Sequence, residues 1–180
     1  MSSETTENRS FSKIEKKEFE MLVAKNMRRA YYSALGLLGS HDAAMDLSQE
    51  AFIRAYKNYD KFDERRNFFS WYYKILKNLC LNFIRDKKRR KEEPILEYRN
   101  DELENENPQE TVEKNELTEL IQEALSELEF EEREIIVLRE FEDYSYNEIA
   151  DMLNIPAGTV MSRLYYARKK LAGKLKRMMI

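Results

Sequence analysis

Between residues 91 and 115 the sequence loses the apolar periodicity that marks helices on both sides of it. This stretch contains Pro94, Pro108, several asparagines and many glutamates, a composition that cannot supply a packed core. Before and after it, apolar residues recur every three to four positions, as in amphipathic helices. Glycine (4) and proline (3) are rare among the 180 residues, so little interrupts these helices. We therefore predict an all-α chain of two small helical domains joined by a flexible acidic linker.

The predicted boundaries follow from the same patterns. The chain divides into a disordered N-terminus, a first helical domain, the acidic linker and a second helical domain, over residues 1–14, 15–90, 91–115 and 116–180. In the first domain we expect helices over about 15–36, 42–58 and 68–90. In the second domain we expect helices over about 117–127 and 130–142, followed by two shorter helices within 145–171.

The formal net charge of −3 hides two strongly basic runs. Residues 85–91 hold six basic residues and one acidic residue, and residues 163–177 hold seven basic residues and no acidic one. Local charge, and not net charge, decides how strongly a surface attracts phosphate. Each run taken alone fits a nucleic-acid contact and a solvated helix face equally well.

Composition excludes several other kinds of site. The sequence has a single cysteine, Cys80, and a single histidine, His41. A structural zinc site uses about four nitrogen or sulfur ligands, so we predict no metal, no cofactor and no internal disulfide. No apolar run approaches the roughly 20 residues of a membrane span, and no secretory signal is visible. We expect a cytoplasmic protein without direct membrane insertion.

The segment 145–171 predicts a helix-turn-helix. Ser145 and Glu148 have the spacing of a capping box, which starts a helix. Asn154 stands where a tight turn requires a positive φ, and Pro156 suits the first turn of the next helix. Apolar spacing then turns four residues of that helix inward, namely Val160, Leu164, Ala167 and Leu171. Its outer face can enter the major groove. The alternative is a plain helical hairpin with a solvated basic face.

In the first domain, aromatic residues accompany a basic helix. Six polar or aromatic residues recur at steps of three, four or seven and so share one helix face: Trp71, Lys74, Asn78, Asn82, Arg85 and Arg89. Rings beside cations suit single-stranded nucleic acid, where bases stack on the rings. We predict that Tyr72 belongs to the core. For Phe68, Phe69, Trp71 and Tyr73 the pattern leaves both core packing and base stacking open.

Asp46 and Glu50 lie one turn apart on the second predicted helix, with Gln49 beside them. This spacing permits a carboxylate pair for acid–base chemistry. No nucleophile, metal partner or glycine-rich phosphate loop accompanies the pair, so we predict no enzymatic activity. A solvated or protein-binding face is the better interpretation.

Three segments resemble one known family, the small extracytoplasmic-function sigma factors of bacterial RNA polymerase. DLSQEAFIRAYKNYDKF, from Asp46 to Phe62, resembles the polymerase-binding helix of sigma region two. FFSWYYKILKNLCLNFIRDKKRR resembles the adjoining promoter-melting segment. The stretch from Leu125 to Leu171 resembles sigma region four and is the most specific part. The resemblance covers about residues 17–175 and implies a non-catalytic subunit that directs polymerase to promoters and helps to open them.

The family implies a role for each segment. The residues expected to dock on core RNA polymerase are Asp46, Gln49, Glu50 and Phe52. The residues expected to bind the downstream element and its melted single strand are Lys61, Phe68, Phe69, Trp71, Lys74, Asn78, Asn82 and Arg85. The residues expected to read the double-stranded upstream element are Thr159, Ser162, Arg163, Tyr165 and Arg168. An anti-sigma factor is a further expected partner.

The chain also departs from the family pattern. Met161 and Tyr166 stand at positions that are commonly basic in the family, and Asn82 stands where many members have Asp. The promoter sequence therefore cannot be transferred from relatives. Two other classes stay open at this point. One is a stand-alone helix-turn-helix regulator, although no dimerisation element is evident. The other is an enzyme that acts on nucleic acid, which the missing catalytic constellation disfavours.

Overall fold

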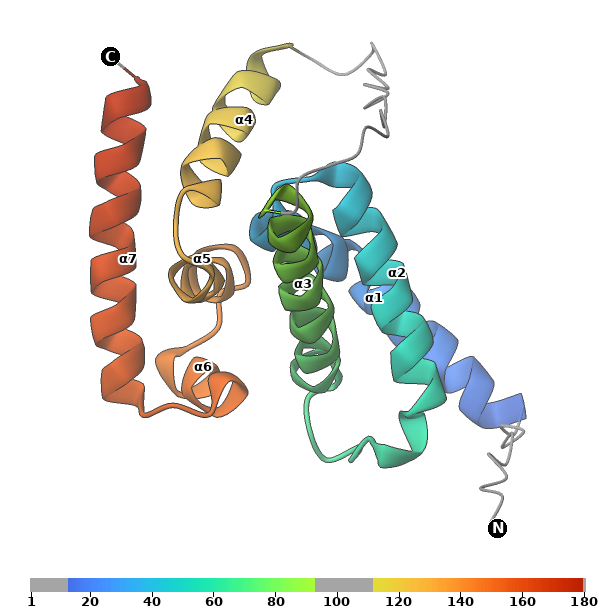
Figure 1. The fold of residues 1–180 in the computed structure, drawn as a ribbon. Helices are drawn as coiled ribbons and strands as arrows, with labels where there is room; N and C mark the ends of the chain where they lie inside the picture. The colour runs from blue at the N-terminus through green and yellow to red at the C-terminus, as the bar shows by residue number, and fades with distance from the viewer. Residues whose placement is uncertain (1–12, 93–111, 180) are drawn as a thin grey trace.

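The computed structural model of the chain describes residues 13–92 and 112–179, and both ranges are helical without any strand (Figure 1). The first half contains α1 (Lys13–Leu38), α2 (His41–Lys57), the 3-10 turn η1 (Tyr59–Lys61) and α3 (Phe68–Glu92). The second half contains α4 (Val112–Ser126), α5 (Phe130–Ile136), the π-helical turn η2 (Val137–Phe141), α6 (Tyr146–Leu153) and α7 (Ala157–Met178).

The prediction of an all-α chain with two helical units is confirmed, and most helix bounds agree within a few residues. Three helices extend beyond the predicted units, because α1 begins at Lys13, α3 reaches Glu92 and α4 begins at Val112. The rest of the predicted disordered N-terminus and of the predicted linker lies outside the described residues. The prediction of a single α-helix over 130–142 is wrong in one respect, because α5 is followed by the π-helical η2. There the Glu142 N–H donates to the carbonyl of Val137 at 3.1 Å.

The predicted break between α1 and α2 is confirmed at Gly39 and Ser40. Gly39 has φ +66°, a left-handed conformation that glycine adopts without steric cost, and its N–H bonds to the Leu35 carbonyl at 2.8 Å. Ser40 then caps α2, since its hydroxyl accepts a hydrogen bond from the Ala43 N–H. The two helices are thereby turned back on each other, and both pack on α3.

An aromatic cluster holds α1, α2 and α3 together. Tyr72 is completely buried, its ring stacks on Phe52 with centroids 4.3 Å apart, and its hydroxyl donates to the Ser48 carbonyl at 2.9 Å. This confirms the prediction that Tyr72 belongs to the core. Edge-on contacts join Phe19 to Phe68 across α1 and α3. Aromatic pairs of this kind add about 0.5–1.5 kcal/mol each beyond the area they bury.

Cys80 lies in the same core, where burial raises the pKa of its thiol to about 12. Because the thiolate is the reactive form, only about one thiol in 10⁴ is ionised at pH 8. We expect Ellman's reagent at pH 8 to label the folded protein over hours and the denatured protein within minutes. Rapid labelling of the folded chain at pH 8 would contradict the burial of this face of α3 in the core.

The two halves pack against each other, which the sequence did not predict. In Figure 1, α5 lies beside α3. Two side chains of α3 hydrogen-bond to a buried carboxylate of α5. The Glu134 side chain is 2% exposed, accepts a hydrogen bond from Lys77 Nζ at 2.8 Å and accepts another from the Tyr73 hydroxyl at 3.3 Å. Burial raises the pKa of Glu134, and the contacts with Lys77 and Tyr73 oppose that rise. A buried carboxylate between the halves is tolerated because it is paired.

A second buried carboxylate fastens η2 to α1. Glu142 forms an ion pair with Arg29 and accepts a hydrogen bond from the Ser33 hydroxyl. The Arg29 guanidinium also lies over the rings of Phe69 and Tyr144, at 4.1 and 4.6 Å from their centroids. Arg29 therefore joins a ring from each half of the chain through cation–π contacts.

Candidate nucleic-acid and polymerase interface

The helix-turn-helix is present as predicted. The Ser145 hydroxyl accepts from the Glu148 N–H, and the Glu148 carboxylate accepts from the Ser145 N–H at 2.8 Å, which completes the capping box. Asn154 ends α6 with φ +55° and ψ +49°, so the predicted positive φ is confirmed. Pro156 occupies the N-cap of α7, immediately before its first turn. The predicted inward residues Val160, Leu164 and Ala167 are buried, and Leu171 is half-buried.

The outer face of α7 is exposed along its length. Among the residues predicted to read the upstream element, Ser162, Arg163, Tyr165 and Arg168 are exposed and Thr159 is half-buried. The Ser162 hydroxyl donates to the Thr159 carbonyl within the first turns of the helix. The structure therefore places these five side chains on or beside one continuous surface of α7.

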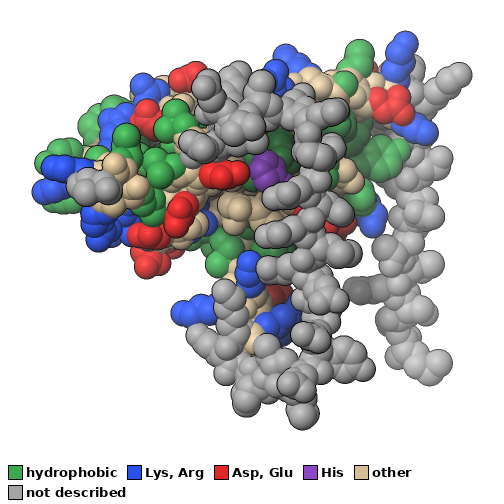
Figure 2. Space-filling view, turned by 90° about the horizontal axis from the view of Figure 1, so that it is seen from above, with side chains coloured by type: hydrophobic (Ala, Val, Ile, Leu, Met, Phe, Trp, Pro, Cys, Tyr) green, Lys and Arg blue, Asp and Glu red, His purple; other side chains and the backbone are tan. Residues whose placement is uncertain are grey.

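Acidic partners neutralise part of the basic run on α7. Arg168 donates to Glu140 at 2.5 Å, Lys174 pairs with Glu127 at 2.6 Å and Lys170 pairs with Glu132. In Figure 2, Lys and Arg side chains on the side of α7 accordingly lie among acidic and hydrophobic ones. Sequence inspection missed these pairs because the partners lie 28 to 47 residues upstream. Exposed pairs of this kind contribute little stability, so phosphate can compete for the cations.

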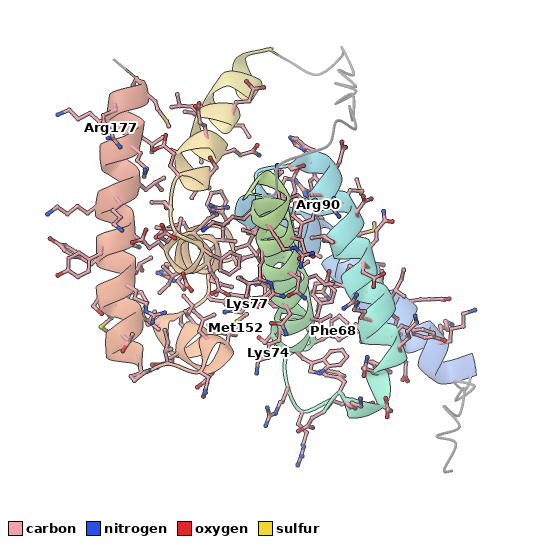
Figure 3. All side chains as sticks on the ribbon, in the orientation of Figure 1. Phe68, Lys74, Lys77, Arg90, Met152 and Arg177 are labelled. Atoms are coloured by element: carbon pink, nitrogen blue, oxygen red, sulfur yellow. The ribbon has the colours of Figure 1, made fainter. Side chains whose placement is uncertain are left out.

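On α3, the predicted melting face is only partly at the surface. Lys74, Asn78, Asn82 and Arg85 are exposed, Trp71 is half-buried, and Arg85 donates to the Asn82 side chain at 2.7 Å. The basic run continues to the C-terminal end of α3, where Figure 3 shows Arg90. Lys61, on η1, is also exposed, and its ammonium donates to Asn58 at 2.8 Å.

Phe68 and Phe69 are buried in the aromatic cluster, at 7% and 1% exposure, and Tyr73 is fully buried. Of the two interpretations that the sequence left open, the structure supports core packing for these three rings. Figure 3 shows Phe68 on the side of α3 that faces α2. In this arrangement neither Phe68 nor Phe69 is available to stack on a base, because the rings of Phe19 and Phe62 pack against Phe68 and the Arg29 guanidinium lies over Phe69.

Trp71 and Lys74 line a groove of about 820 Å³ between α3 and the helix-turn-helix. Its opposite wall is formed by α6 and the turn that follows, including Glu148, Met152 and Asn154. Figure 3 shows Lys74 near the lower end of α3 and Met152 between α6 and α3, where the two halves face each other. Residues predicted to bind the melted strand thus share one groove with the domain predicted to bind duplex DNA.

The predicted polymerase-binding residues do not all lie at the surface. Asp46 and Gln49 are exposed on α2, and Glu50 is half-buried and pairs with Arg54 at 2.7 Å. Phe52 is 9% exposed because its ring stacks on Tyr72, so it supports α2 from beneath instead of forming part of the outer face. The structure instead exposes Met45 and Ile53, each 49% accessible, on that helix. Exposed large apolar residues between charges often mark a protein-binding surface, and the sequence-based prediction for α2 did not include these two residues.

Within 13–92 and 112–179, no three His, Cys, Asp or Glu side chains are arranged to hold a metal ion. Over the same residues, none of the helices is long and apolar enough to cross a membrane. The arrangement suits macromolecular contacts on three faces, namely the outer faces of α2, α3 and α7.

Comparison with known proteins agrees with this geometry. Residues 22–90 match the family described as Sigma-70 region 2, and residues 118–171 match Sigma-70, region 4. The ECF RNA polymerase sigma factor SigW of Bacillus subtilis is 35% identical over 82% of this chain and 83% of its own length. The ECF RNA polymerase sigma-E factor of Escherichia coli K12 is 31% identical over 91% of this chain and 89% of its own length.

Two solved structures share the fold. The sigma factor RpoE of Bartonella quintana, in complex with the anti-sigma factor NepR, has a TM-score of 0.70 and 24% identity, covering 89% of this chain and 98% of its own. CnrH, in complex with the cytosolic domain of CnrY, has a TM-score of 0.67 and 25% identity, covering 90% of both chains. With both regions matched in order, the chain belongs to the extracytoplasmic-function sigma factors, the promoter-directing subunits of bacterial RNA polymerase.

Proposed function

We propose that this sigma factor divides its work among the three exposed helix faces. The outer face of α2 docks on core RNA polymerase through Asp46, Gln49 and Glu50, with Met45 and Ile53 supplying apolar contact. The polar face of α3 binds the melted downstream strand through Trp71, Lys74, Asn78, Asn82 and Arg85, with Lys61 on η1 beside it. The outer face of α7 reads the upstream element through Thr159, Ser162, Arg163, Tyr165 and Arg168.

The observation that carries this proposal is the combination of a capped helix-turn-helix and an aromatic, basic helix in one chain. Opening a duplex costs on the order of 1.4 kcal/mol per base step. Stacking of a released base on an aromatic ring contributes about 1–3 kcal/mol of binding free energy, which offsets part of this cost. Trp71, half-buried on the polar face of α3, can supply this contact, and Lys74 and Arg85 can hold the phosphates.

The groove between α3 and α6 adds a conformational requirement. Trp71 and Lys74 face Met152 and Asn154 there, so a strand bound to α3 must displace α6 or share the groove with it. We therefore propose that the two halves separate when the chain binds polymerase and promoter. Polymerase then holds both halves at a fixed spacing, and two weak DNA contacts act as one through effective concentration.

We also propose an anti-sigma factor as a partner, in the cytoplasm. The similar sigma factor RpoE was solved in complex with the anti-sigma factor NepR, and the similar protein CnrH was solved with the cytosolic domain of CnrY. The binding and opening of DNA need no catalysis by the chain itself. We therefore propose a non-enzymatic role, and the absence of nuclease or ATPase activity in purified protein is the check.

The test of the function is run-off transcription with core polymerase and genomic fragments, followed by mapping of the start sites. We expect initiation at a small set of positions only when this chain is added. A stable dimer that binds palindromic DNA without polymerase would instead favour a stand-alone regulator. Loss of initiation in Trp71→Ala with unchanged polymerase binding would assign that residue to melting.

Charge reversal on α2 tests the docking face. We expect Glu50→Lys to weaken co-purification with core polymerase by about tenfold or more, because like charges placed across an interface cost several kcal/mol. Glu123→Lys on exposed α4 is the matched control, since it makes the same change on the other half of the chain. Equal polymerase retention by the two variants would reject α2 as the docking face.

A further inference from the structure

The N-terminal half of α7 presents large apolar side chains to solvent. Met161 is 51% exposed and Tyr165 is 62% exposed, and the two lie one turn apart on the same face. They line a shallow concavity of about 690 Å³, and its other lining residues are Tyr146, Leu164, Arg168 and Lys169. Two exposed apolar groups beside two cations form a surface that is neither core nor an ordinary solvated face.

The position of this patch matches the part of a recognition helix that meets bases. α7 begins at Ala157, so Met161 lies in its second turn and Arg168 and Lys169 lie two turns further on. In helix-turn-helix proteins the N-terminal residues of the second helix contact base edges. Cations further along position the protein on phosphates. Met161 therefore falls where a side chain selects a base.

The chemistry of methionine restricts which base that is. Its side chain has no hydrogen-bond donor and only a weak acceptor, so it cannot pair with the N7 and O6 acceptors of guanine as arginine does. Covering those acceptors with a thioether would leave them without partners, which is unfavourable. In the major groove, the apolar group on a base edge is the C5-methyl of thymine.

We infer that Met161 packs against the C5-methyl group of a thymine in the upstream element, with the Tyr165 ring beside it. The inference rests on the proposed role of α7 and adds the chemical identity of one recognised base. It also explains one departure from the family pattern. Met161 stands at a position that is commonly basic in the family, and methionine at this position favours thymine over guanine.

The experiment uses holoenzyme, reconstituted from this chain and core polymerase, and promoter duplexes with a randomised upstream element. The duplexes that bind are sequenced, and a selected duplex is then remade with deoxyuridine in place of one thymine at a time. Deoxyuridine lacks only the C5-methyl group. For wild type, we expect one substitution to weaken binding about fourfold, the equivalent of one buried methyl-sized group at ~0.8 kcal/mol.

Variants identify the residue that senses the methyl group. Met161→Ala should bind the thymine and deoxyuridine duplexes equally, and Met161→Arg should shift the selected base toward guanine. Met179→Ala, which truncates an exposed methionine beyond the end of α7, should keep the wild-type preference. Because Met161 is half in solvent, its truncation leaves the core intact.

Two outcomes would overturn the inference while leaving the sigma function standing. One is holoenzyme that selects promoters but is indifferent to deoxyuridine at every position. The other is a thymine preference that persists unchanged in Met161→Ala. Failure of the holoenzyme to select any promoter would instead refute the proposed function itself.

Discussion

Replacing Gly36 by alanine is expected to loosen the contact between the two halves. A Cβ at this position would lie 2.7 Å from Val137 Cγ2, closer than real Cβ atoms approach a neighbour. Val137 is fully buried in η2 and β-branched, so its methyl groups have little freedom to move away. Overpacking of this kind costs about 1–3 kcal/mol, which exceeds the 0.5–1 kcal/mol that alanine normally gains over glycine in a helix.

The matched control for this prediction is Gly173→Ala. Gly173 lies in α7, and a Cβ added there would meet no atom within 4 Å, so alanine at this position should stabilise the protein. Denaturant unfolding should thus show opposite signs for the two substitutions, with a net loss of about 1–2 kcal/mol for Gly36→Ala. Adding Val137→Ala should restore the packing between α1 and η2 in the double variant, although it leaves less apolar contact.

The same variant tests whether the halves must separate. If Gly36→Ala opens the groove between α3 and α6, small-angle scattering should show a larger radius of gyration. The free chain should then bind single-stranded promoter DNA more tightly through Trp71 and Lys74. Equal stabilisation by Gly36→Ala and Gly173→Ala would mean that α1 and η2 are not in close contact at Gly36.

The second large effect is expected at Asn154. Its φ of +55° lies in the left-handed region, which Gly adopts freely and Asn tolerates. Most other residues lose roughly 1–2 kcal/mol there, and a β-branched residue fits worst. We expect Asn154→Val to destabilise the turn between α6 and α7 by about that amount. Footprinting with holoenzyme should then show weaker protection of the upstream element, because α7 loses its fixed position.

Asn154→Gly separates backbone strain from loss of the side chain. Glycine adopts the left-handed conformation freely, so this variant should keep a footprint close to that of wild type. Polymerase binding should survive in both variants, since α2 belongs to the other half of the chain. A wild-type footprint for Asn154→Val would show that the turn tolerates another conformation and that positive φ does not position α7.

Local signals in the sequence determined the helices and their ends. The capping box of Ser145 and Glu148, the left-handed turn at Asn154 and the break at Gly39 are each decided by residues within four positions. The inward face of α7 also follows from spacing alone, because 3.6 residues per turn bring Val160 and Leu164 onto one side. Division into two helical units and the family follow from the same local patterns.

Only the tertiary structure decided which of these faces are free. Phe52, Phe68 and Phe69 looked available for binding, but side chains from other helices cover them. Rings cover Phe52 and Phe68, and the Arg29 guanidinium of α1 lies over Phe69. Sequence spacing does not show these contacts. The pairing of Glu140 with Arg168, and of Glu134 with Lys77, joins residues 28 and 57 positions apart. Helical periodicity reports which residues share a face, and the partner of that face is set by long-range packing. The sequence therefore determined the helices and their ends, while the packing of the two halves determined which surfaces are left to bind polymerase and DNA.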